Sequence, residues 1–102
     1  MKIEFAVTPP GGGGIDYSVT FETSALPITG DFIFKQENEG KALAYATFIV
    51  TRRRFFSDQA GGRVVVEVEP ARSSQESIAH RRLCVKYASR GKQVQELPDS
   101  GY

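Results

Sequence analysis

The chain has 102 residues, of which 40% are hydrophobic and 25% charged, and its formal net charge is +1. This length gives one domain with a modest hydrophobic core, and the near-neutral charge differs from that of a typical basic nucleic-acid binder. The single cysteine, Cys84, excludes an internal disulfide, and no apolar stretch is long enough for a signal peptide or a membrane-spanning helix, so we expect a cytoplasmic protein without a membrane partner.

The first residues of the chain predict a hairpin of two half-buried strands. Residues 2–7 and 15–22 both alternate apolar and polar side chains, which is typical of a strand with one buried face. The Pro-Pro-Gly-Gly-Gly-Gly segment between them has two prolines that cannot donate to a ladder and four flexible glycines. We therefore expect an irregular, mobile loop. It does not match a phosphate-binding loop, because no Lys-Ser or Lys-Thr pair follows the glycines.

The middle of the chain predicts three further strands. Residues 31–36 form a short one, and a polar turn follows it. Residues 41–50 are apolar at almost every position, which indicates a strand buried on both faces. This strand continues into three arginines, and residues 57–62 carry a strong turn signal. The returning strand is the valine-rich segment 63–69, and we expect Pro70 to end it.

The turn places the three arginines on both faces of a second hairpin. Arg52 and Arg54 share one face and Arg53 lies on the other. Two registers are open: Arg52 lies opposite Glu67, or Arg52 lies opposite Glu69 with Arg54 opposite Glu67. Either register sets arginines beside carboxylates, and each exposed pair of this kind contributes about 0.2–1 kcal/mol.

The last part of the chain permits two interpretations. Ser73 and Glu76 have the spacing of a capping box, which predicts a helix that starts near residue 74. Alternating apolar side chains favour a short helix, residues 74–81, followed by strands at 83–88 and 92–97. The alternative is one longer helix over residues 74–90 that ends at a glycine.

Together these elements predict an all-β fold, mainly antiparallel, that forms a small sandwich or barrel of six to seven strands with one short helix near 74–81. With the longer helix, residues 74–90, the fold is α+β. In both versions residues 1–97 form a single β-rich domain, and residues 98–102 form a frayed tail.

Nothing in the chain predicts catalysis. His80 and Cys84 are the only histidine and the only cysteine, fewer than the three or four ligands of a zinc site. No third group orients them as a nucleophile pair, and no Ser-His-Asp arrangement is recognisable. We therefore expect no catalytic residues, no metal and no cofactor, and hence a protein that is not an enzyme.

Basic residues concentrate in the second half of the chain. Residues 52–92 contain ten basic and four acidic residues, a charge of +6, whereas residues 1–51 contain three lysines and six acidic residues, a charge of −3. Arginine and phenylalanine are enriched in protein interfaces, and they also bind phosphates and stack on unpaired bases.

We therefore predict a non-catalytic binding or assembly module that acts through protein–protein contacts. Its partner is another protein or a second copy of the chain, paired through an edge strand such as residues 2–7 or 92–97. The alternative is a domain that binds single-stranded nucleic acid or a nucleotide. Both functions would use the same predicted binding residues: Arg52, Arg53, Arg54, Phe55, Phe56, Arg63, Arg81 and Arg82.

Overall fold

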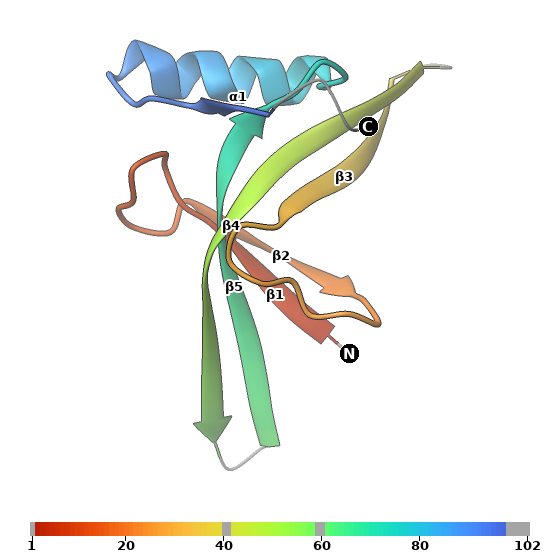
Figure 1. Ribbon diagram of the computed structural model, residues 1–102, viewed down its shortest axis with the longest axis vertical. Helices are drawn as coiled ribbons and strands as arrows, with labels where there is room; N and C mark the ends of the chain where they lie inside the picture. The colour runs from red at the N-terminus through yellow and green to blue at the C-terminus, as the bar shows by residue number, and fades with distance from the viewer. Residues whose placement is uncertain (1, 40–41, 59–60, 98–102) are drawn as a thin grey trace.

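A computed structural model describes residues 2–39, 42–58 and 61–97 and shows one curled sheet with a helix across one end (Figure 1). The five longer strands have the order β2-β1-β5-β4-β3, and β6 pairs with β5. In chain order the elements are β1 Lys2–Val7, β2 Tyr17–Glu22, β3 Phe32–Glu39, β4 Ala42–Asp58, β5 Gly61–Arg72, α1 Ile78–Ser89 and β6 Gln95–Glu96. The predicted tail, residues 98–102, lies outside the described residues. So do residue 40 of the polar turn, residue 41 of the predicted strand 41–50, and residues 59–60 of the predicted turn at 57–62.

The prediction of a mostly β fold with one helix is confirmed, but its architecture differs. The sheet is mixed, because β1 and β6 both run parallel to β5, while the other neighbours are antiparallel. It curls into a half-barrel and forms neither an antiparallel sandwich nor a closed barrel. Since β1 lies between β2 and β5, residues 2–7 are not the free edge strand that the sequence suggested. Within the described residues, no helix is long and apolar enough to cross a membrane.

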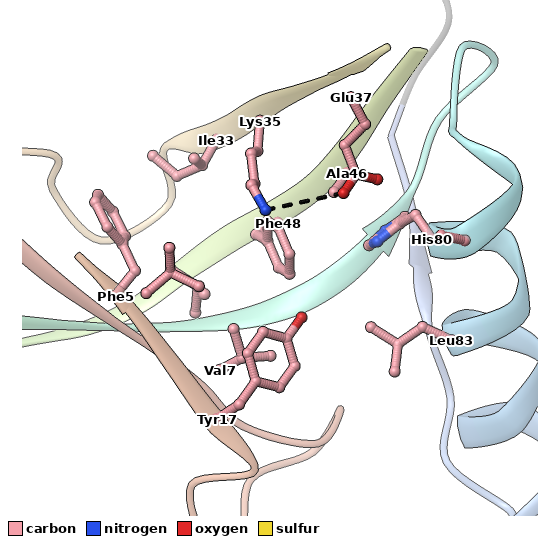
Figure 2. A pocket seen from close by; sticks show the side chains of 13 residues that line it. Phe5, Val7, Tyr17, Ile33, Lys35, Glu37, Ala46, Phe48, His80 and Leu83 are labelled. Carbon is pink, nitrogen blue, oxygen red and sulfur yellow. Dashed lines mark ion pairs between the residues drawn. The ribbon is translucent and has the colours of Figure 1, made fainter. Parts of the chain in front are cut away.

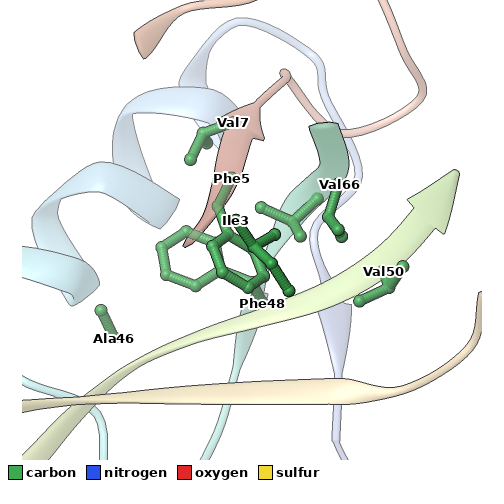
Figure 3. Close-up of a cluster of buried hydrophobic side chains, with 8 residues drawn as sticks. Ile3, Phe5, Val7, Ala46, Phe48, Val50 and Val66 are labelled. Carbon is green, nitrogen blue, oxygen red and sulfur yellow. The ribbon is translucent and has the colours of Figure 1, made fainter. Parts of the chain in front are cut away.

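The hydrophobic core lies on the concave face of the sheet (Figure 3). Side-chain alternation along β1, β4 and β5 directs every second residue to this face. Leu26, Ile33 and Val64 pack around the cluster as partly buried neighbours. The buried cluster consists of Ile3, Phe5, Val7, Ala46, Phe48, Val50, Val66 and Val68.

Helix α1 begins later than predicted because the residues before it are held against β4. The Tyr45 backbone N–H donates to the Gln75 carbonyl, and the Tyr45 carbonyl accepts from the Ser77 N–H, both at 2.9 Å. The Ser77 side chain then caps the helix, since its hydroxyl accepts from the His80 N–H at 3.1 Å. The helix therefore does not start at the predicted Ser73 capping box.

The prediction of a strand at residues 83–88 is wrong, because these residues belong to α1. A strand at 83–88 would place Val85 on the same face as Leu83 and Tyr87, but Val85 is exposed. The buried side chains of the helix are instead four and three residues apart, as helical periodicity requires: His80, Cys84 and Tyr87. The alternative helix over residues 74–90 matches α1 more closely. Of the predicted strand at 92–97, only the two residues of β6 are strand.

Pro70 does not end β5, contrary to the prediction. Every second residue of β5 directs its backbone polar groups to the same side: the Val68 carbonyl accepts from the Thr8 N–H at 2.9 Å, and the Arg72 carbonyl accepts from the Leu97 N–H at 2.8 Å. Pro70 lies between these two positions, in the gap between the end of β1 and the start of β6. No ladder donor is needed there, so a proline fits inside the strand.

Candidate binding surface

Strands β4 and β5 are longer than their neighbours, and their outer parts project from the sheet. On one side β3 and the residues before it accompany β4 only as far as Val50, which bonds to Gly30 and Asp31. On the other side β1 pairs with β5 only from Val65 onward. Residues 51–58 and 61–64 therefore form a two-stranded ribbon, here called the arm, which points away from α1 (Figure 1).

A β-bulge at the base of the arm sets the direction of its side chains. Arg52 lies opposite Glu67, the first of the two predicted registers, but Val50 lies opposite Val68 because the pairing shifts between them. The Thr51 hydroxyl donates to the Glu67 carbonyl at 3.2 Å. The extra residue keeps Val50 in the core while the strand continues. Beyond the bulge, Arg53 and Phe55, which pair with Val66 and Val64, lie on the concave side of the arm. Arg54, which lies between them, is on the convex side, together with Arg52.

The convex side holds two arginines near one carboxylate. Arg54 Nε is 2.6 Å from Glu67 Oε2, whereas Arg52 Nε is 3.9 Å from the same oxygen. Both arginine side chains are about half exposed or more, so each pair contributes about 0.2–1 kcal/mol. Glu69 does not pair with these arginines; its Oε1 accepts from the Gly11 N–H at 3.0 Å. One carboxylate therefore faces two guanidinium groups, and a positive charge remains on this surface.

The two phenylalanines of the arm lie on opposite sides, each beneath an arginine. The Cζ atom of Arg53 is 5.7 Å from the centre of the Phe55 ring, and that of Arg63 is 4.8 Å from the centre of the Phe56 ring. Such exposed cation–π contacts contribute about 0.5–1 kcal/mol each. Phe55 is nevertheless 66% exposed and Phe56 39% exposed. The arm thus presents aromatic and cationic groups to solvent on both sides.

A groove of about 360 Å³ separates the convex side of the arm from the glycine loop. The loop returns over the sheet with Gly11, Gly12 and Gly13 at positive φ, a conformation that only glycine adopts without strain. Two arginines and two glutamates line the groove, so its charges balance. Nothing in the sequence predicts this groove, because it depends on the parallel pairing that places β1 beside β5. Its lining residues are Glu4, Gly13, Gly14, Ile15, Arg54, Phe56, Arg63, Val65 and Glu67.

Two of the predicted binding residues lie far from the arm. Arg81 and Arg82 are on α1, at the opposite end of the molecule (Figure 1). Arg81 Nε is 3.3 Å from Glu76 Oε1, and Arg72 Nη2 is 2.8 Å from the same oxygen. The structure therefore brings six of the eight predicted residues together on the arm and leaves Arg81 and Arg82 outside it.

The His80 and Cys84 side chains are both buried against the sheet. His80 Nε2 is 2.8 Å from the Ala71 carbonyl, which can only accept, so this nitrogen carries a proton. The 3.4 Å approach of the Thr47 amide to the same nitrogen is then a packing contact. Burial, with a smaller effect from the Glu76 charge, raises the pKa of the Cys84 thiol to about 11. A cysteine nucleophile requires a lowered pKa, which argues against this role for Cys84.

The part of the chain that the structure describes contains no group of three or more His, Cys, Asp or Glu side chains that could hold a metal ion. Comparison of the chain with protein-family models, curated proteins and solved structures gave no match.

Proposed function

We propose that the protein is a non-catalytic assembly module that makes protein–protein contacts through the arm, and that its partner is a second copy of the chain. The observation that carries this proposal is Phe55. It is 66% exposed, and it lies on a stretch of β4 that no described strand covers on the side away from β5. A long open strand edge with an exposed aromatic side chain is a template for pairing with another strand.

Symmetric pairing of two β4 edges would join complementary side chains. In an antiparallel pair centred on Arg54, Arg53 lies opposite Phe55 of the second copy, and Arg52 lies opposite Phe56. Arg52 and Arg53 then each meet an aromatic ring, the kind of contact that Arg53 and Phe55 already form within one chain. Arg54 alone faces its own counterpart, and the Glu67 of each copy, 2.6 Å from the Arg54 of its own chain, offsets that repulsion.

Self-association can be measured by sedimentation velocity over a range of protein concentrations. Burying the exposed part of Phe55 is worth about 1–2 kcal/mol per copy, so Phe55→Ser should raise the dimer Kd by roughly 30-fold to 1000-fold. Phe32→Ser is the matched control, since Phe32 is 37% exposed on β3, outside the arm. A wild-type protein that stays monomeric up to about 1 mM would overturn the proposal.

A second candidate function is binding of single-stranded nucleic acid or a nucleotide in the groove beside the glycine loop. Phe56 and Arg63 line this groove as a stacked pair, which suits an unpaired base and its phosphate. Glu4 and Glu67 in the same groove oppose an anion, which is why we place this function second. Fluorescence anisotropy of labelled single-stranded DNA and RNA tests this second function. Binding that weakens steeply with salt and is lost in Arg63→Glu would support nucleic-acid binding, whereas no binding at low salt would exclude it.

A further inference from the structure

A second hollow lies at the other end of the molecule, between the concave face of the sheet and α1 (Figure 2). Its volume is about 130 Å³. It exists because α1 inserts His80, Cys84 and Tyr87 against the sheet and leaves the neighbouring part of the concave face unfilled. The walls are mainly apolar and include Phe5, Val7, Phe48 and Val68 from the sheet and Ala79 and Leu83 from the helix.

The few polar groups at this cavity cancel in charge. Lys35 Nζ is 3.8 Å from Glu37 Oε2, and the Ser77 hydroxyl donates to Glu37 Oε1 at 2.5 Å. His80 is already engaged with the Ala71 carbonyl. The lysine and the glutamate therefore balance each other, and an ionised ligand would lose its hydration without gaining an unpaired counter-charge.

Tyr17 supplies a polar group for a ligand. Figure 2 shows its ring directed inward from β2, with the hydroxyl on the Phe48 side of the cavity. Burial and, to a lesser extent, the carboxylates of Glu37 and Asp16 raise the pKa of this hydroxyl, so it stays protonated at neutral pH and can both donate and accept a hydrogen bond.

We propose that this cavity binds a small uncharged ring compound that carries one hydroxyl group, with the ring between the sheet and α1 and the hydroxyl bonded to Tyr17. The size supports a single ring, because an apolar cavity of about 150 Å³ in another protein holds benzene. The lining supports an apolar body, and the balanced charges of Lys35 and Glu37 support a neutral molecule. This site is separate from the arm and does not depend on self-association.

Phenol, benzene and benzoate are suitable probes, because they share one ring and differ in their polar group. Methyl NMR spectra of the full chain report binding through the signals of Val7, Val68 and Leu83. We expect phenol to shift these signals saturably and to bind about threefold to tenfold more tightly than benzene, the gain of one hydrogen bond. Benzoate should show no saturable shift at the same concentrations, because its charge would be buried without a free partner.

Two variants on α1 test the location of the site. Ala79→Phe fills the cavity from the helix and should weaken phenol binding by about tenfold or more. Ala88→Phe makes the same change on the same helix at an exposed residue that does not line the cavity, and it should leave the phenol affinity unchanged. If Ala79→Phe does not fold, Tyr17→Phe still tests the site, because it removes only the hydroxyl and should make phenol and benzene bind equally.

Several results would overturn the proposal that this cavity binds a neutral ring compound with one hydroxyl group. It fails if phenol produces no saturable shift of the cavity methyl groups, or if Ala79→Phe and Ala88→Phe bind phenol equally. Benzoate binding as tight as phenol binding would exclude a neutral ligand class. An unchanged preference for phenol over benzene in Tyr17→Phe would exclude the hydrogen bond to that residue.

Discussion

Replacing Glu76 with glutamine should destabilise the protein by about 1–2 kcal/mol at neutral pH. The Glu76 side chain is 2% exposed, and its Oε1 accepts hydrogen bonds from Arg72 Nη2 at 2.8 Å and from Arg81 Nε at 3.3 Å. Glutamine preserves the shape and one acceptor oxygen but removes the charge. Charge-assisted hydrogen bonds contribute about 1.5–3 kcal/mol each, against about 0.5–1.5 kcal/mol for neutral ones.

Two effects reduce the loss below the sum of both bonds. The Arg72 and Arg81 side chains are 41% and 60% exposed, so water screens both guanidinium groups and solvates them when the carboxylate is removed. The other carboxylate oxygen, Oε2, is buried without a hydrogen-bond partner among the described residues, and its desolvation cost falls when the charge is removed. The loss of the charge-assisted hydrogen bonds is still the larger effect on stability, because both arginines donate to the same oxygen.

The effect should depend on pH in one direction. Burial raises the pKa of Glu76, but the hydrogen bonds and charge of Arg72 and the hydrogen bond of Arg81 outweigh it and hold the pKa below the ordinary value of 4.5. A carboxyl group with a lower pKa in the folded state stabilises the protein above its unfolded pKa, and this stabilisation is lost as the pH falls through the folded pKa. The difference between wild type and Glu76→Gln should therefore be constant above pH 4.5 and shrink below it.

Urea unfolding followed by circular dichroism, at about pH 7, 5 and 3, measures this difference. Glu96→Gln is the control, since Glu96 is an exposed carboxylate on β6, and its effect should stay within about 0.5 kcal/mol. A Glu76→Gln variant more stable than wild type at pH 7 would show that the desolvation of Glu76 outweighs its arginines. A difference as large at pH 3 as at pH 7 would show that its charge has no role.

Two further predictions concern α1. Ser77→Ala should destabilise the protein by about 1–2 kcal/mol in urea unfolding, because it removes both the helix cap and the hydrogen bond to Glu37. Ser74 is exposed, so the control Ser74→Ala should change stability little. Equal effects of the two changes would refute the Ser77 cap. Cys84, buried with a pKa of about 11, should react with iodoacetamide at mildly alkaline pH far more slowly in native protein than in urea, and equal rates would show that the thiol is accessible.

Much of the sheet follows from local alternation. Apolar side chains at every second position of β1 and β5 identify the concave face, and the same pattern places Val66 and Val68 in the core. Alternation does not reveal strand direction, however. The parallel pairing of β1 with β5 joins Phe5 to Val66, residues distant in sequence, and no turn between them signals it.

The prediction of a strand at residues 83–88 is wrong for a different reason. Leu83, Val85 and Tyr87 alternate as in a strand, whereas Ala79, Leu83 and Tyr87 lie four residues apart as in a helix, so the side chains alone do not decide. In the structure the segment is helical, and α1 packs on the end of β5 with His80 Nε2 2.8 Å from the Ala71 carbonyl. Such tertiary contacts determine the outcome where local preference is weak.

The arm was the part of the candidate surface that local chemistry could predict. Adjacent arginines and phenylalanines, followed by a turn, place Arg53 and Phe55 on one side whatever the register. The bulge at Thr51 could not be foreseen, because it forms where core packing of Val50 and the pairing of Arg52 with Glu67 require different alternation. The distance of Arg81 and Arg82 from the arm likewise depends on where the sheet places α1.

Because the arm and the cavity lie on separate parts of the same two long strands, the two proposals can be tested independently. Phe55 lies beyond the bulge, on a ribbon that neither β1 nor β3 covers, whereas Ala79 lies on α1 at the opposite end. Phe55→Ser should therefore alter self-association without changing phenol affinity, and Ala79→Phe should do the reverse. Changes at separate sites with no shared contacts are additive in most proteins. If either variant changed both properties, β4 and β5 would transmit strain between the two sites, and neither measurement alone would locate a binding surface.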